Sequence, residues 1–186
     1  MNKLYIIFLL LIFSNCKNEV SQYLKNTTPL FDLKGFLDHE IATHLKDIKM
    51  VKKTVTVNGK TETKEVEIKD WKEELKPFFN SDINRPAWRD KYKFEKRMGD
   101  TIGFFHLFYR VDENLRTKTM SVYFLDENRA ASVHVWNEQK SAIADSDEDL
   151  QYFGKANQQI YQIKTKQKMP LSDEQVIEIK VEKLKD

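Results

Sequence analysis

The sequence predicts an α+β domain, in which a curved antiparallel β-sheet meander carries one or two helices packed on one face. Three observations lead to this fold class. Apolar residues recur at helical spacing only between residues 33 and 78. From Tyr92 onward they alternate with polar residues at the two-residue period of strands. Short turn signals separate these later segments, and short connections favour antiparallel neighbours.

Two helices are expected before the meander. The first should span residues 33–48 with Asp32 as its N-cap, because its apolar residues repeat at intervals of four and three and form one stripe. The second follows Asp70, which together with Glu73 fits a capping box. Its apolar face comprises Trp71, Leu75 and Phe78. Each apolar stripe should pack against the sheet.

A hairpin is expected between the two helices, followed by a series of strands. Residues 51–57 and 60–68 flank Asn58-Gly59, and this dipeptide supplies the positive φ angles that a type I′ turn requires. The later strands are predicted at 92–98, 101–111, 117–125, 129–136, 150–153, 158–167 and 174–184.

The expected coverage differs among these strands. Residues 101–111 are apolar on both faces, which predicts a central strand covered on both sides. In the last strand, Ile177, Ile179 and Val181 alternate with charged residues, so one face should lie in water. The acidic run 145–149 is interpreted as a solvated turn. It opens like an EF-hand calcium loop but lacks the glycine and the final glutamate of that loop.

The first sixteen residues have the pattern of a secretion signal. Lys3 precedes an unbroken apolar run from Leu4 to Phe13, which gives way to the polar segment Ser14-Asn15-Cys16. A helix that crosses a bilayer needs roughly 20 apolar residues, about twice the length of this run. The pattern therefore indicates a signal peptide and not a transmembrane anchor.

Cys16 is the only cysteine in the chain, so it has no partner for an internal disulfide. The segment resembles the lipoprotein signal of Bacteroidota, in which such a cysteine becomes the lipidated first residue. Residues 13–15 depart from the usual lipobox, which favours Leu three residues before the cysteine and Gly or Ala directly before it. Lys17-Asn18-Glu19 is similar to a charged surface-export tag, and the strand layout after Asp149 looks like that of uncharacterised lipoproteins of this group.

The resemblance implies a signal peptide at 1–15, a lipidated N-terminus and tether at 16–30, and one α+β domain at 31–186. Acyl chains such as palmitate on Cys16 would hold the protein in a membrane of the cell envelope, with the outer membrane as the expected place. The alternatives are a plain signal peptide with an incidental cysteine and an uncleaved helix buried in the fold.

The charge is nearly balanced, with 31 Lys and Arg against 29 Asp and Glu. Nucleic acid is not expected as a partner, because its phosphates are bound by clustered basic residues. The sequence contains no glycine-rich phosphate loop and no Gly-x-Ser-x-Gly elbow. No cofactor, metal or catalytic residue is assigned.

The histidines offer the remaining motifs. Residues 39–44 come close to the zinc-protease motif, but His39 and His44 are five residues apart and not four. On an α-helix this spacing would separate them by about 140°, so they are interpreted as surface residues. His106 and His134 lie on strands predicted to be neighbours or next-but-one. Histidines whose hydrogen bonds are satisfied within the sheet are favoured there over a metal site or an acid–base site. Residues 100–102, Asp-Thr-Ile, fit a short O-glycosylation pattern of Bacteroidota.

Aromatic residues crowd the middle strands more than a one-sided sheet requires. They either fill the core or form a cradle for an apolar ligand or a protein partner. The ligand-binding residues proposed for such a cradle are Phe108, Tyr123 and Trp136. The favoured function is thus a non-catalytic, lipid-anchored envelope protein that binds through its sheet. An envelope hydrolase with a dispersed Asp/Glu/His site and a purely structural lipoprotein are the alternatives.

Overall fold

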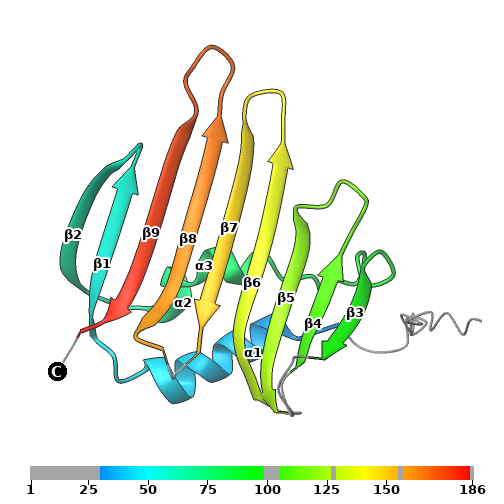
Figure 1. Ribbon diagram of the computed structural model, residues 1–186, viewed down its shortest axis with the longest axis horizontal. Helices are drawn as coiled ribbons and strands as arrows, with labels where there is room; N and C mark the ends of the chain where they lie inside the picture. Colours follow the sequence, from blue (N-terminus) through cyan, green and yellow to red (C-terminus); the bar gives the residue numbers. More distant parts are fainter. Residues whose placement is uncertain (1–29, 99–104, 127–128, 155–156, 185–186) are drawn as a thin grey trace, which may run out of the picture.

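The computed structural model describes residues 30–98, 105–126, 129–154 and 157–184. These residues form an open antiparallel sheet of nine strands, and the helices pack against one of its faces (Figure 1). The predicted α+β class, with a curved antiparallel sheet and few helices, is confirmed.

The elements follow the order that the sequence predicts. The helical segments are α1 (Leu33–Glu40), η1 (Ile41–Leu45), α2 (Trp71–Glu74) and α3 (Lys76–Phe79). The strands are β1 (Met50–Val57), β2 (Lys60–Glu67), β3 (Lys93–Met98), β4 (Phe105–Arg110), β5 (Thr117–Asp126), β6 (Arg129–Lys140), β7 (Asp145–Phe153), β8 (Gln159–Lys168) and β9 (Gln175–Lys183).

The strand order is β2-β1-β9-β8-β7-β6-β5-β4-β3. Strands β3 to β9 form the predicted meander, and the β1–β2 hairpin joins it beside the last strand, where Val55 lies opposite Ile179. The turn of that hairpin has φ angles of 47° at Asn58 and 84° at Gly59, as a type I′ turn requires. The Asn58 side chain also accepts a hydrogen bond from the backbone N–H of Val176, 2.8 Å long.

The first helix is not α-helical over its whole predicted length. Asp32 caps it as expected, accepting a 2.9 Å hydrogen bond from the Gly35 N–H. A Cβ atom at position 35 would lie 2.3 Å from the Asp32 carboxylate, so glycine suits this close approach. After Glu40 the chain widens into the π-helical turn η1, where the Lys46 N–H bonds to the Ile41 carbonyl five residues back.

The second predicted helix is divided into α2 and α3. Leu75 between them has φ −90° and ψ 9°, outside the helical region. Pro77 explains the break, because its ring would clash with the carbonyl four residues earlier in a continuous helix. Asp70 caps α2 as predicted, with a 2.7 Å bond from the Lys72 N–H. The Glu73 carboxylate pairs with Lys76 at 3.0 Å and not with the Asp70 N–H, so the capping box was predicted wrongly at this second position.

The core lies between the helices and one face of the sheet. Phe78 is fully buried, and its ring meets the rings of Tyr152 and Tyr161 edge-on at centroid distances of 6.3 and 6.1 Å. Phe36 packs against the other side of Tyr152 at 5.7 Å. These aromatic contacts join α1 and α3 to the central strands β7 and β8.

Two strand predictions were wrong. The acidic run 145–149 is the first half of β7 and not a turn, and the turn is formed by residues 141–144. Every residue of this run except Ser146 is acidic, so the hydrophobic period that marks other strands is missing. Cross-strand charge pairs support the strand instead, since Asp145, Asp147 and Asp149 lie opposite lysines of β8.

The strand predicted at 101–111 is neither central nor covered on both faces. Its described part, β4, is second from the edge of the sheet, and residues 101–104 lie outside the described residues. Tyr109 is buried under the helices, whereas Phe108 on the other face is only half-buried. Apolar residues on both faces therefore do not mark a sandwiched strand here.

We expect Phe78→Ala to lower the free energy of unfolding by about 3 to 5 kcal/mol, because the ring is fully buried between two tyrosines. Urea unfolding followed by tryptophan fluorescence measures this change. Ile143→Ala is the control: its side chain is 79% exposed, and its effect should stay within about 0.5 kcal/mol. Equal effects of the two substitutions would contradict this description of the core.

Candidate binding face of the sheet

The face of the sheet opposite the helices, here called the open face, carries the three residues that the sequence proposed for ligand binding. Side chains alternate between faces along a strand, so Phe108 points away from the buried Tyr109 beside it. Phe108 lies opposite Ser121, and Ser121 lies opposite His134. Tyr123 and Trp136 share this face, two positions from Ser121 and His134. The three aromatic residues therefore come from the adjacent strands β4, β5 and β6.

Polar partners surround these aromatic side chains. The His106 ring lies 5.2 Å from that of Tyr123, and the Arg97 guanidinium lies 4.8 Å from the centre of the Phe108 ring. We call His106, Phe108, Tyr123, His134 and Trp136 the aromatic patch. Tyr123 is 44% exposed, and the other four are half-buried. The patch is thus mixed in polarity and not a uniformly apolar surface.

The two strand histidines occupy separate environments. His106 on β4 and His134 on β6 are separated by β5, so they are next-but-one, one of the two arrangements expected. Burial lowers the pKa of His106, the Arg97 guanidinium lowers it further, and Glu95 opposes this shift. His134 Nε2 lies 2.9 Å from the Asp149 carboxylate, which also accepts a 3.1 Å bond from Gln151.

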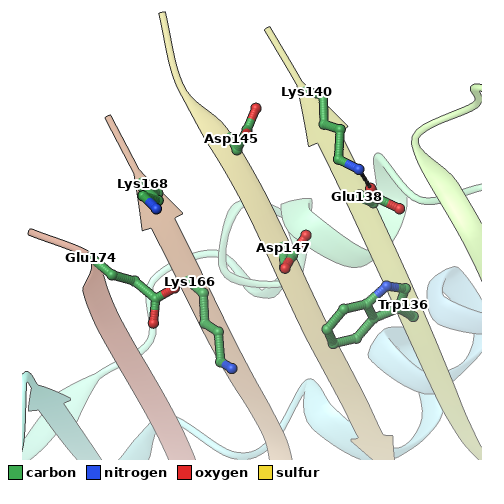
Figure 2. A pocket seen from close by; sticks show the side chains of 8 residues that line it. All are labelled: Trp136, Glu138, Lys140, Asp145, Asp147, Lys166, Lys168 and Glu174. Atoms are coloured by element: carbon green, nitrogen blue, oxygen red, sulfur yellow. Dashed lines mark ion pairs between the residues drawn. The ribbon is translucent and has the colours of Figure 1, made fainter. Parts of the chain in front are cut away.

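A groove begins at Trp136 and runs along the open face (Figure 2). Its volume is about 390 Å³. In Figure 2 the lining side chains come from the neighbouring strands β6, β7 and β8, and from Glu174 directly before β9. We call it the Trp136 groove, and its lining residues are Trp136, Glu138, Lys140, Asp145, Asp147, Lys166, Lys168 and Glu174.

Charges of opposite sign line the Trp136 groove in register. Asp147 lies opposite Lys166 and Asp145 opposite Lys168 across the β7–β8 pair. Glu138 and Lys140 form an ion pair at 2.6 Å, drawn as a dashed line in Figure 2. This bond lowers the pKa of Glu138 and raises that of Lys140. The other five charged side chains make no hydrogen bond or ion pair with any residue that the structure describes.

A buried polar network fixes the strands that carry the groove. Asn137 is 1% exposed, and its amide donates 2.8 Å and 3.0 Å bonds to the Ser81 hydroxyl and the Glu148 carboxylate. The Thr117 hydroxyl bonds to Asn137 Oδ1 at 3.0 Å. Glu148 also receives a 2.7 Å bond from Arg116. Sequence reasoning missed this network because its members are far apart in the chain and none of them forms a local motif.

On the helix side, the carboxylate of Glu40 is 7% exposed and accepts two hydrogen bonds. The Tyr152 hydroxyl donates to it at 2.9 Å, and His44 Nδ1 lies 3.0 Å away. The Thr43 hydroxyl, 3.2 Å from His44 Nδ1, already donates to the His39 carbonyl. Since both neighbours of Nδ1 are acceptors, we assign the proton of neutral His44 to Nδ1.

The helical geometry behind the interpretation of His39 and His44 was wrong. The π-helical turn brings the two rings to a centroid distance of 6.1 Å, although an α-helix would separate them by about 140°. His44 is half-buried and bonded to Glu40, so it is not a simple surface residue. Within the described ranges, no three His, Cys, Asp or Glu side chains are placed to share a metal ion.

Glu40 and His44 also line a cavity of about 750 Å³ at the end of the sheet. Leu125, Ala130 and Ala131 supply its apolar wall. The pairing of Glu40 with Tyr152 joins residues 112 positions apart, so no local sequence signal could reveal this arrangement.

Several predictions concern residues outside the described ones. They are the signal peptide at 1–15, Cys16, the tether up to residue 29 and the short pattern at 100–102. In the part of the chain that the structure describes, no helix has the length and the hydropathy needed to cross a bilayer.

The chain matches no protein-family model, and comparisons with curated proteins and with solved structures found no match. Its function is therefore argued from its own residues.

We expect the stability to fall as the pH rises above 10. Burial raises the pKa of Tyr109 to about 12, and burial together with Glu40 raises the pKa of Tyr152 still further. The unfolded chain then loses its tyrosine protons first, so it binds fewer protons than the folded chain between these pKa values. Each such tyrosine lowers the free energy of unfolding by about 1.4 kcal/mol per pH unit in that window.

Urea unfolding from pH 8 to 11.5 measures this slope. Tyr109→Phe should make the slope shallower above pH 10, whereas Tyr123→Phe, which alters an exposed ring, should leave it unchanged. A slope that is the same in all three proteins would contradict the assignment to buried tyrosines.

Proposed function

We propose that this chain is a non-catalytic, lipid-anchored protein of the cell envelope that binds a partner through the open face of its sheet. The observation that carries the proposal is the placement of Phe108, Tyr123 and Trp136 on the face that none of the described helices covers. Helices fill the other face and supply the core, so the aromatic residues of the open face are not needed for it. The resemblance of residues 4–19 to a lipoprotein signal supports the anchoring.

The chemistry of the open face favours a polar partner over a buried lipid tail. An apolar chain in the Trp136 groove would remove the lining charges from water, and an unpaired buried charge is costly. The aromatic patch has Arg97, Asp149 and two imidazoles at its surface. Such a mixed surface resembles an interface in which a few aromatic anchors are surrounded by polar groups.

An envelope hydrolase remains the competing hypothesis. The Glu40–His44 pair is the arrangement that favours it, because a carboxylate that holds Nδ1–H leaves the other ring nitrogen of neutral histidine as a base beside the 750 Å³ cavity. Among the described residues that line this cavity, none is a serine, threonine or cysteine that could act as a nucleophile. The open face therefore provides the better-supported function.

Cys16→Ser should abolish membrane attachment. Each buried CH2 of an acyl chain contributes about 0.8 kcal/mol to membrane binding, and Cys16 is the proposed site of attachment. Labelling of a Bacteroidota host with radioactive palmitate, followed by membrane fractionation, measures both lipidation and attachment. Ser21→Ala is the control and should keep label and location. Label retained by the Cys16→Ser protein would contradict the anchor.

Replacement of Phe108, Tyr123 and Trp136 by alanine should reduce binding to isolated, delipidated envelope at least tenfold. Removal of three central aromatic anchors lowers affinity more than removal of scattered surface groups. Co-sedimentation of the full-length protein with envelope material measures the bound fraction, and urea unfolding checks that the variant is folded. The matched control replaces three exposed apolar side chains of the β6–β7 and β8–β9 turns, outside the aromatic patch: Ile143, Met169 and Leu171. Equal losses in the two triple variants would count against the open face.

A further inference from the structure

The Trp136 groove combines a flat aromatic side chain with unused hydrogen-bonding groups. Figure 2 shows the indole ring reaching from β6 toward β7 with its face in view, at the end of the groove where the charged side chains begin. The face of an aromatic ring carries partial negative charge and attracts weakly positive C–H groups that lie flat against it. The ring of a pyranose sugar presents such a row of C–H groups on one side.

The charged side chains supply both partners that a hydroxyl group needs. A sugar hydroxyl donates one hydrogen bond and accepts others, so it is served by a carboxylate on one side and an ammonium group on the other. Asp147 and Lys166 face each other across adjacent strands, and so do Asp145 and Lys168. These four side chains make no ion pair with one another or with any other described residue, so their donors and acceptors remain available to a ligand.

The balance of charge selects a neutral ligand. Four carboxylates and three lysines line the groove, and the aspartates of β7 face the lysines of β8 across it. A phosphate or a carboxylate ligand would meet the aspartates, and a polycation would meet the lysines. A lipid tail would strip water from all of these groups without replacing their hydrogen bonds. A neutral molecule with many hydroxyl groups avoids all three conflicts.

The position of the groove on the open face favours a ligand that extends beyond it. Its volume of about 390 Å³ lies at the lower end of the range for small-molecule sites. At its Trp136 end it adjoins the aromatic patch, where His134 and Tyr123 continue along the same face. A linear ligand could therefore fill the groove and extend toward a second exposed aromatic ring.

We infer that the Trp136 groove binds a neutral saccharide chain, with one sugar ring stacked on the indole of Trp136 and its hydroxyls held by the Asp–Lys pairs of β7 and β8. This inference rests on the proposed function and specifies the chemical class of its partner. Trp136 is the stacking platform, Asp145 and Asp147 accept hydrogen bonds, and Lys166 and Lys168 donate them.

Binding of neutral oligosaccharides to the full-length protein tests the inference. The probes are cellopentaose, chitopentaose and mannopentaose, measured by isothermal titration calorimetry in low detergent. At least one should bind, and Trp136→Leu should weaken that binding at least tenfold because leucine keeps apolar bulk without a ring face. Trp136→Phe should retain most of the affinity. Asp147→Asn combined with Lys166→Met, which removes both charges at similar side-chain size, should weaken binding several-fold.

Trp88→Leu is the matched control, since Trp88 is half-buried beside Arg85 at a site away from the groove. It should leave saccharide binding unchanged. If the Trp136 variants do not fold, the variant at Asp147 and Lys166 tests the same site. It alters only exposed or half-buried polar groups of the open face, so we expect it to fold.

The outcomes separate this inference from the proposed function. If none of the three saccharides binds while the open-face triple variant still loses envelope binding, the saccharide inference is overturned and the binding function stands. If every variant keeps saccharide binding and envelope binding, both the saccharide inference and the proposed function are overturned. Saccharide binding that survives Trp136→Leu would place the sugar elsewhere and also overturn the inference, as would a native mass spectrum in which a lipid occupies the protein and blocks the saccharide.

Discussion

The structure depends on the way in which all the described helices cover the same face of a broad antiparallel sheet. Side chains alternate between the two faces of every strand, so this single constraint divides each central strand into a core half and an open half. Strand β6 shows this division. Its residues Val133, Val135 and Asn137 are buried, whereas His134 and Trp136 between them lie half-buried on the open face. The binding properties of the open face follow from the residues that the core does not use.

Two tyrosines of the sheet fix where the helices lie. The Tyr152 hydroxyl donates to Glu40 of α1, and the Tyr161 hydroxyl donates to Glu74 of α2. Phe78 of α3 fills the space between the two rings. Glu74 is further paired with Lys53 of β1 at 2.5 Å, which links this cluster to the hairpin. The two carboxylates at the helix–sheet boundary are tolerated because each accepts a hydrogen bond from a donor on a neighbouring element.

The Trp136 groove depends on strand register in the same way. A slip of one residue between β6 and β7 would exchange the faces, turning Glu148 outward and Asp147 into the core. The bond between Asn137 and Glu148 and the bond between Thr117 and Asn137 oppose such a slip from inside. The Asp–Lys pairs of β7 and β8 oppose it from outside. One register thus determines the buried network and the open groove together.

Local patterns in the sequence identified the parts of the fold that local interactions control. The Asn58-Gly59 turn, the caps at Asp32 and Asp70 and the meander of strands were all confirmed, because each depends on residues close in the chain. The predicted extent of β7 was wrong, because the first half of this strand carries no apolar alternation and its acidic residues face lysines of β8 across the strand pair. The π-helical turn was also missed, since no local signal distinguishes it from α-helix.

The sequence by itself determined that the chain folds as an α+β domain with helices on one face of an antiparallel sheet, because hydrophobic periodicity and turn chemistry act over a few residues. The lipoprotein-type signal is a proposal from the sequence alone. Only the tertiary structure decided which aromatic residues leave the core. Phe108 and Tyr109 are adjacent and equally apolar in pattern, yet the helices bury only Tyr109. The Trp136 groove likewise required strands β6, β7 and β8 to be placed side by side, since its charges become neighbours only across the sheet.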